Sequence, residues 1–280
     1  MPDVHVLAAI RPEAAERYER ELAGQGLSAV KMVRSKAETR VALEDSTTRA
    51  DVLVIDNELG GIFDFVRELR LTYPRLLIVL VDEDADFSMP GRADDVSTDP
   101  FDNHDLARRI QRLVQERQTE TLRADALPPV RSVAKLLRQA SGLVGKVDAA
   151  VEAIQAMGYD FVAYYRIMDE VAGDTRLTAA AGDKAITSIA PERQKATSVI
   201  GWVAHNGQSR VVGPEDEPNY SLVQRGRLGA GACVPVGSAT PHGVLLACRE
   251  QPGSISQENV MLLELVSAQL AAALAKEMSS

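Results

Sequence analysis

Short apolar runs alternate with helix-like segments over the first hundred residues. The run from Leu76 to Val81 is six consecutive aliphatic residues, which is typical of a strand buried on both faces. Strand–helix alternation of this kind predicts right-handed βαβ units and a doubly wound, five-stranded parallel sheet of α/β class. The predicted strands are residues 4–8, 28–33, 51–55, 76–81 and 94–98. The predicted helices are residues 11–24, 36–45, 62–71 and about 106–114.

The pattern changes after a charged stretch that is broken by Pro128 and Pro129. Strands flanked by helices at both ends then predict an α+β domain with an antiparallel sheet. Its strands are expected at residues 161–167, 177–181, 231–236 and 244–249. Its helices are expected at residues 130–140, 147–157, 198–205 and 256–274. We therefore predict one domain at 1–118, a helical connector at 119–129 and a second domain at 130–280.

Length, composition and charge limit the classes of protein to which the chain can belong. A length of 280 residues suggests about two domains, and 40 acidic against 31 basic residues gives a formal net charge of -9. Such a chain has no electrostatic drive toward nucleic acid or an anionic membrane, so neither is expected as a partner. Cys233 and Cys248 are too few for a disulfide framework. With no secretory signal and no apolar run near the roughly 20 residues of a membrane span, we expect a cytoplasmic protein.

Two segments of the first domain resemble segments of a known protein family. Residues 51–59 (DVLVIDNEL) resemble the third strand and phosphoacceptor turn of response-regulator receiver domains, which places Asp56 at the phosphorylated aspartate. Residues 93–101 (ADDVSTDPF), followed by Leu106 and Ile110, resemble the fifth strand and last helix of the same family. The resemblance covers roughly residues 3–117 and implies a receiver-like, flavodoxin-like fold.

The resemblance also implies that the receiver chemistry is lost. An active receiver holds Mg²⁺ with an acidic pair and the acceptor aspartate, and steadies the phosphoryl oxygens with a Ser or Thr and a Lys. Here the acidic pair aligns with Ala8 and Ala9, the hydroxyl with Asp82 and the lysine with Asp99. Alanine cannot bind metal, and like charges about 4 Å apart cost about 4 kcal/mol at an effective dielectric near 20.

We therefore predict a phosphorylation-incompetent pseudo-receiver in which Asp56 is vestigial and no metal is bound. Domains of this kind usually serve in protein docking or dimerisation. In the plainest interpretation Asp56 is a polar cap at the end of its strand. A different interpretation gathers four carboxylates into a cation site. Those four are Asp56, Asp82, Glu83 and Asp99.

The second half of the chain resembles a GAF domain over roughly residues 130–278. The run at 199–208 (VIGWVAHNGQ) resembles the central GAF helix and turn, and 242–247 (HGVLLA) resembles the closing strand. Between them lie residues 210–212 and 231–236, and the helix from Ser256 resembles the last GAF helix. GAF domains are sensory modules whose pocket holds a cyclic nucleotide, a bilin, a haem or nothing.

The residues favour no particular ligand, and no cofactor is expected. The Asn-Lys-Phe-Asp-Glu set of cyclic-nucleotide binders is missing, and neither cysteine is followed by the histidine that often accompanies a bilin attachment site. Trp202, Tyr220 and Cys233 are our candidates for the pocket lining. Two alternatives remain: Trp202 is an ordinary core residue, and both cysteines are small buried hydrophobic residues.

No phosphate loop, dinucleotide fingerprint, metal-spaced His/Cys set or GxSxG turn is present, so we expect no enzyme. Free methionine-R-sulfoxide reductases use a GAF fold, but they need an accessible thiolate. We predict a non-enzymatic signalling or scaffolding protein that acts through protein contacts. We also predict a homodimer through helices near 103–145 and 256–278. The alternatives are a GAF-based small-molecule or chromophore sensor and a response regulator phosphorylated at Asp56.

Overall fold

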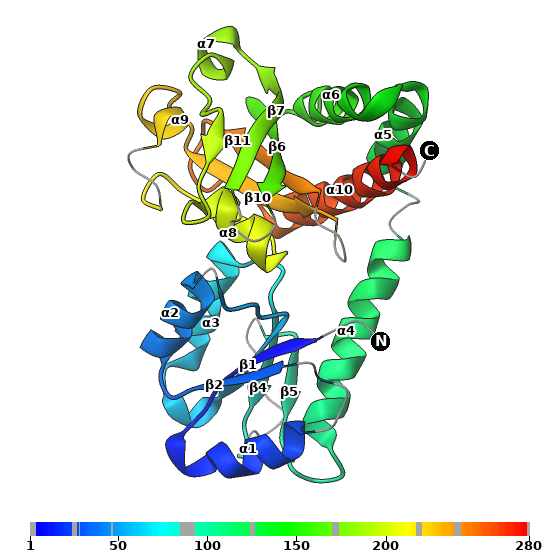
Figure 1. The fold of residues 1–280 in the computed structure, drawn as a ribbon. Helices are drawn as coiled ribbons and strands as arrows, with labels where there is room; N and C mark the ends of the chain where they lie inside the picture. The colour runs from blue at the N-terminus through cyan, green and yellow to red at the C-terminus, as the bar shows by residue number, and fades with distance from the viewer. Residues whose placement is uncertain are drawn as a thin grey trace. The chain divides into compact units, whose positions relative to one another are not determined.

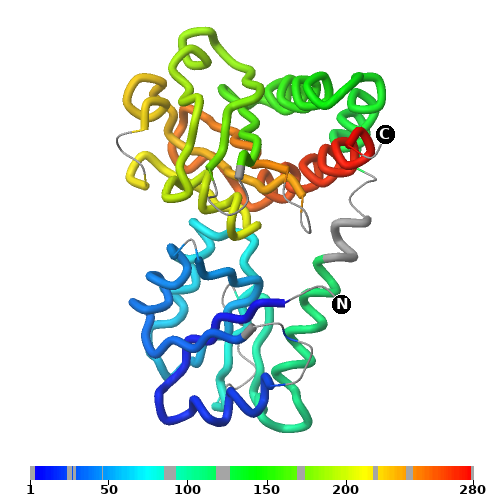
Figure 2. Tube along the Cα trace, in the orientation of Figure 1, coloured from blue at the N-terminus to red at the C-terminus, as the bar shows by residue number. Residues whose placement is uncertain are grey.

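The computed structural model describes two compact units (Figures 1 and 2). The first comprises residues 1–71 and 76–122, and the second comprises residues 72–75 and 123–280. The described residues are 4–23, 27, 29–45, 47–84, 93–123, 127–169, 174–216, 220–237 and 242–278. Parts of the predicted connector (124–126) and of the acidic loop before Tyr220 (217–219) lie outside them.

The first unit contains a five-stranded sheet in the order β2-β1-β3-β4-β5, and every pair is parallel. This is the strand order of flavodoxin-like doubly wound folds, and the predicted α/β class is confirmed. All residues of β3 and β4 are buried, as their apolar runs predict. The strands are β1 (His5–Ala9), β2 (Ala29–Val33), β3 (Val52–Asp56), β4 (Leu77–Val81) and β5 (Asp95–Ser97).

Helices lie on both faces of this sheet. On one face Tyr18 and Leu22 of α1 (Ala15–Leu22) pack with Leu106 and Ile110 of α4 (Asp105–Arg123). The other face carries α2 (Lys36–Glu44) and α3 (Ile62–Thr72), and two 3₁₀ turns, η1 (Pro12–Ala14) and η2 (Asn57–Leu59), follow β1 and β3 (Figure 1). Helix α4 continues through residues 119–123 of the predicted helical connector.

The second unit is built on a six-stranded antiparallel sheet in the order β8-β7-β6-β11-β10-β9. The predicted α+β class is confirmed, although the sequence analysis did not predict the two edge strands, which have two and three residues. The strands are β6 (Phe161–Asp169), β7 (Asp174–Gly182), β8 (Arg193–Gln194), β9 (Arg210–Val212), β10 (Ala230–Val236) and β11 (Gly243–Arg249). The helices are α5 (Pro128–Gln139), α6 (Gly142–Gln155), α7 (Lys184–Thr187), α8 (Val199–Asn206), α9 (Ser221–Gln224) and α10 (Gln257–Met278).

Three helices, α5, α6 and α10, form the core with one face of this sheet. The buried residues of these helices include Val133 of α5 and Leu263 and Leu270 of α10. Ser256 caps α10 by accepting a hydrogen bond from the Asn259 backbone N–H at 3.2 Å. Among the described residues α10 is the one helix long and apolar enough to cross a membrane by length and composition. In this fold its apolar side is part of the domain core.

The opposite face of the sheet carries α8, whereas the short helix α9 lies nearer to α7 (Figure 1). Ser198 caps α8 by accepting from the Gly201 N–H at 3.1 Å, and the helix ends at Gly207, whose φ of 65° favours glycine. A Cβ at Gly201 would overlap the backbone of Lys195 and Ala196, so this residue allows the helix to approach the chain before it.

Candidate functional site

The carboxyl ends of the parallel strands meet at one edge of the first sheet, where open α/β folds usually place their sites. Asp56 ends β3 and is 2% exposed, while Asp82 and Asp99 follow β4 and β5. Ala8 and Ala9 end β1 and are fully buried, so β1 offers only methyl groups at this edge. The residues compared above with a receiver site therefore lie at the strand ends.

The buried Asp56 carboxylate has two hydrogen-bond partners. Its Oδ2 accepts from Arg11 Nε at 3.0 Å, and its Oδ1 accepts from the Glu58 N–H at 3.0 Å, which caps η2. The same guanidinium lies 3.6 Å from a carboxylate oxygen of Glu58. The hydrogen bond to Asp56 raises the pKa of Arg11. Arg11 thus supplies the positive charge that compensates the buried carboxylate.

Arg11 was missed by the sequence reasoning, which stopped at the alanines. The available signal was a basic side chain placed two residues after Ala9, beside the turn that follows β1. The pairing joins residues 45 positions apart, so it depends on the parallel register of β1 and β3. Spacing along the chain does not reveal it.

The other carboxylates at this edge have separate partners. Asn57 donates to Asp82 at 3.0 Å, Glu83 lies 3.6 Å from Arg17, and Thr98 donates to Asp99 at 3.2 Å. In the part of the chain that the structure describes, no group of three or more His, Cys, Asp or Glu is placed to hold a metal ion. The structure does not bring Asp56, Asp82, Glu83 and Asp99 together as one cation site.

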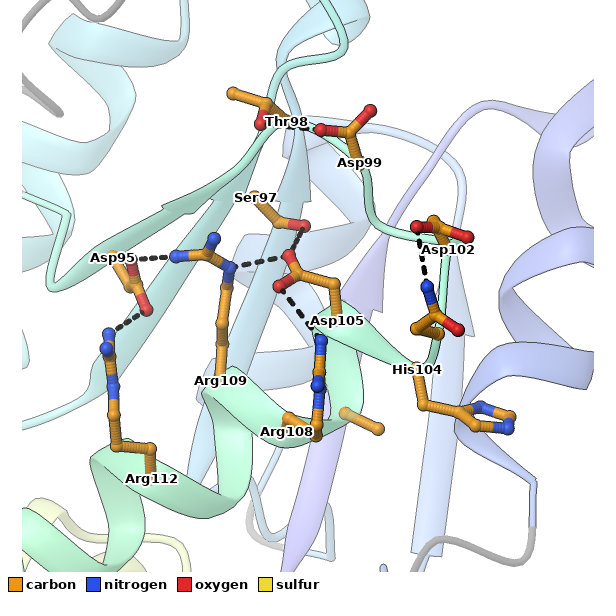
Figure 3. Close-up of polar contacts among 12 residues, drawn as sticks. Asp95, Ser97, Thr98, Asp99, Asp102, His104, Asp105, Arg108, Arg109 and Arg112 are labelled. Carbon is orange, nitrogen blue, oxygen red and sulfur yellow. Dashed lines mark hydrogen bonds and ion pairs between the residues drawn. The ribbon is translucent and has the colours of Figure 1, made fainter.

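A second set of charges joins β5 to α4 (Figure 3). Arg109 donates to Asp95 at 2.9 Å and to Asp105 at 2.6 Å, and Ser97 donates to Asp105 at 2.8 Å. Burial disfavours the charged form of Asp105, but the hydrogen bonds from Arg109 and Ser97 outweigh it and lower the pKa of that carboxyl. Arg112 also pairs with Asp95. These groups satisfy one another and hold α4 on the edge strand.

In the second unit, alternation along the strands points Tyr165 and Cys233 to the face opposite the α5–α6–α10 core. Tyr220, at the start of α9, lies on this face. Its hydroxyl is 3.4 Å from the Tyr165 hydroxyl and accepts from Gln194 Nε2 at 3.3 Å. Burial raises the pKa of Tyr165 to about 12 and raises the pKa of Tyr220 further, so the pair is neutral at physiological pH.

Both thiols are buried on the same sheet. Cys233 and Cys248 are 1% and 5% exposed and carry no disulfide. Burial raises the pKa of Cys248 well above its ordinary value. The register places Cys248 opposite Gly231, two positions from Cys233, so the two sulfurs share the face that Tyr165 occupies. This environment keeps Cys248 as a neutral thiol.

The described contacts of Trp202 include none of the residues Tyr165, Tyr220 and Gln194. It is on α8, 5% exposed, with its ring 5.6 Å from the Arg210 guanidinium of β9. Two of the three predicted pocket residues, Tyr220 and Cys233, therefore share the sheet face with Tyr165. Gln194 and Cys248 complete the group, and the sequence analysis did not single out Tyr165 or Gln194.

The second unit is an α+β domain with an antiparallel sheet and helices on both of its faces. Residues 146–275 match the family model of the GAF domain, and this part of the chain is a GAF domain. A GAF domain is a signalling or sensory module. No curated protein sequence matches the chain.

Solved structures resemble the second domain at low identity. The GAF domain of an Acinetobacter phosphoenolpyruvate-protein phosphotransferase is 20% identical, with a TM-score of 0.46, and 54% of this chain and 93% of that chain are covered. Free methionine-R-sulfoxide reductase from Neisseria meningitidis is 17% identical, with a TM-score of 0.46 and coverage of 54% and 88%. The chromophore-binding domain of a bacteriophytochrome from R. palustris is 14% identical, with a TM-score of 0.43 and coverage of 54% and 61%.

Proposed function

We propose that the chain is a non-enzymatic signalling or scaffolding protein. In this proposal the N-terminal domain is a pseudo-receiver that carries out no phosphoryl transfer and acts through protein contacts, and the GAF domain supplies a sensory or regulatory module. The observation that carries the proposal is the Arg11–Asp56 pair beside the two buried alanines of β1.

The chemistry of phosphoryl transfer explains why this observation matters. Catalysis there is mostly positioning and electrostatic stabilisation, and Mg²⁺ needs oxygen ligands. Ala8 and Ala9 offer none, and an Asp56 oxygen already accepts a charged hydrogen bond from Arg11. Asp82 and Asp99 add negative charge at the same edge, which disfavours an incoming phosphoryl group.

The proposal is tested by intact mass after incubation of the full chain with acetyl phosphate and Mg²⁺. We expect no added phosphoryl group on the natural chain. The alternative, a regulator phosphorylated at Asp56, requires a mass increase that disappears in Asp56→Asn.

A second candidate, a small-molecule sensor, is favoured by the hydroxyl and amide groups of Tyr165, Tyr220 and Gln194. These groups are neutral and form a hydrogen-bonded set on a buried sheet face. They suit an uncharged ligand with hydrogen-bonding groups better than an anion. A coloured preparation, or a ligand that raises the melting temperature of the natural chain but not of Tyr220→Phe, would favour this candidate.

Burial of both thiols supports the non-enzymatic part of the proposal, since thiol catalysis needs an accessible thiolate. Cys233 and Cys248 should react with a thiol reagent only after unfolding. A native thiol that reacts as fast as free cysteine would contradict this part. The predicted cytoplasmic homodimer also remains a prediction, and sedimentation as a monomer across the micromolar range would contradict it.

A further inference from the structure

Helix α5 and the start of α6 carry both exposed cations and exposed aliphatic side chains, and we call this set of residues the α5–α6 surface. It consists of Arg131, Lys135, Leu136, Arg138, Leu143 and Val144. Residues 127–147 contain no Asp or Glu, although the chain has 40 such residues in 280. The surface is therefore locally basic on a protein whose net charge is -9.

The three cations follow one side of α5. Arg131, Lys135 and Arg138 are spaced i, i+4 and i+7, so they share a helix face, and all three are exposed. The apolar side of the same helix is in the domain core through Val130, Val133 and Leu137. Within the described residues, no hydrogen bond or ion pair involves the three cationic side chains. They are available to a partner.

The aliphatic part of the surface is held in place by Lys146. Its Nζ donates to the carbonyl oxygens of Leu137 and Ala140 at 2.9 and 3.2 Å, and lies 3.2 Å from a carboxylate oxygen of Glu277. The end of α5, the start of α6 and the end of α10 therefore meet at this buried ammonium group. Figure 1 shows the three helices converging there.

Three aliphatic side chains stay exposed at this junction. Leu136, Leu143 and Val144 are 42%, 38% and 62% exposed. Met278, next to Glu277, is 61% exposed at the same helix end. Exposed apolar side chains at a helix junction whose first helix also carries a row of cations are typical of a docking surface rather than of an ordinary solvated helix.

We propose that the α5–α6 surface binds an acidic, amphipathic segment of another protein. Leucine-like side chains of the segment would contact Leu136, Leu143 and Val144, and its carboxylates would pair with Arg131, Lys135 and Arg138. Complementary charge increases the association rate and excludes basic partners. The inference rests on the proposed function, because it names the kind of partner through which this signalling protein acts.

Two other occupants fit the surface less well. A second copy packed by two-fold symmetry would bring the same row of cations against itself, and like charges repel. A homodimer would therefore use a different helix face. An anionic membrane requires an amphipathic helix to insert its apolar face, but the apolar face of α5 is already in the domain core.

The test measures binding of a fluorescent helical peptide made of Leu and Glu, with one leucine stripe, to the full chain at low salt. The test variant is Arg131→Glu/Lys135→Glu/Arg138→Glu. The matched control is Arg176→Glu/Lys184→Glu/Arg225→Glu, which reverses three exposed cations elsewhere on the same domain. Circular dichroism confirms that both variants are folded. A further variant, Val144→Asp, probes the aliphatic part.

We expect the natural chain and the control to bind the peptide, the test variant to bind about 30-fold more weakly, and Val144→Asp to bind about 10-fold more weakly. No binding to the natural chain, or equal loss in the control, would overturn the inference. Stronger binding to phosphatidylserine vesicles than to the peptide would also overturn it, as would a change in self-association caused only by the test variant. The mass test of phosphoryl transfer is independent, so the two proposals fail separately.

Discussion

Two buried polar sites, one in each domain, differ in charge, and the difference shows how each site is stabilised. In the N-terminal domain a charged carboxylate, Asp56, is buried and compensated by Arg11. In the GAF domain the buried groups of Tyr165, Tyr220 and Cys248 carry no charge, because burial raises their pKa values. The buried carboxylate of Asp56 is stabilised by one cation, Arg11. The buried hydroxyl and thiol groups instead stay neutral because they are shielded from water.

The largest loss of folding stability is expected where a buried charge loses its ion-pair partner. Arg11→Met leaves the Asp56 carboxylate buried without its cation, which should lower the free energy of unfolding by about 3 kcal/mol. This is the low end of the range for such a loss, because the Arg11 side chain is 37% exposed. Urea unfolding followed by circular dichroism measures the change.

The matched control for that prediction removes both charges. Arg11→Met/Asp56→Asn should recover most of the loss, since the neutral amide needs less compensation. A double variant as unstable as Arg11→Met alone would show that Arg11 acts through packing rather than through charge.

A smaller loss of folding stability is expected at β5, the edge strand of the N-terminal sheet. Arg109→Met breaks the contacts with Asp95 and Asp105, which are partly exposed, so the loss should be about 1–2 kcal/mol. The pKa of Asp105 is lowered in the folded state, so its stabilising contribution is present above the ordinary carboxyl pKa and is lost as pH falls. In Arg109→Met the acid-induced loss of stability should be shallower. An unchanged acid profile would contradict this role.

In the GAF domain, the stability contributed by the neutral Tyr165–Tyr220 pair should depend on alkaline rather than acidic pH. The folded-state pKa values of Tyr165 and Tyr220 are raised above those of unfolded tyrosine, near 10. Their contribution to stability is therefore complete below about pH 10 and falls as pH rises toward 12. Tyrosinate absorbance should show these two groups still protonated at about pH 11.

Tyr220→Phe is the smallest perturbation in the series. It removes one hydroxyl that contacts Tyr165 and Gln194, at a cost of about 1 kcal/mol at neutral pH. The same change should reduce the slope of stability against pH above about pH 10. A steeper alkaline slope would mean that the hydroxyl is not neutral in the folded chain.

Much of the fold could be predicted because buried strands and helices have a regular pattern of apolar residues in the sequence. The apolar runs of β3 and β4 were evident in the sequence. Strands β8 and β9 were not, since two or three residues are too few to show a period.

The sites were harder to predict, because their contacts join distant parts of the chain. The alignment placed Asp56 correctly at a strand end, but its partner Arg11 is 45 residues away. Tyr165 lies among the apolar residues of β6, and its neighbour Gln194 lies on a two-residue edge strand. Neither belongs to a motif, so only the tertiary structure brings them to Tyr220.

The central proposal is that the Arg11–Asp56 pair and the alanines of β1 exclude phosphoryl transfer. The decisive measurement is intact mass of the natural chain after incubation with acetyl phosphate and Mg²⁺. A positive control rebuilds the site with Ala8→Asp, Ala9→Asp, Arg11→Ser, Asp82→Thr and Asp99→Lys. We predict an added phosphoryl group on the rebuilt chain and none on the natural chain. A phosphoryl group on the natural chain that disappears in Asp56→Asn would contradict the account.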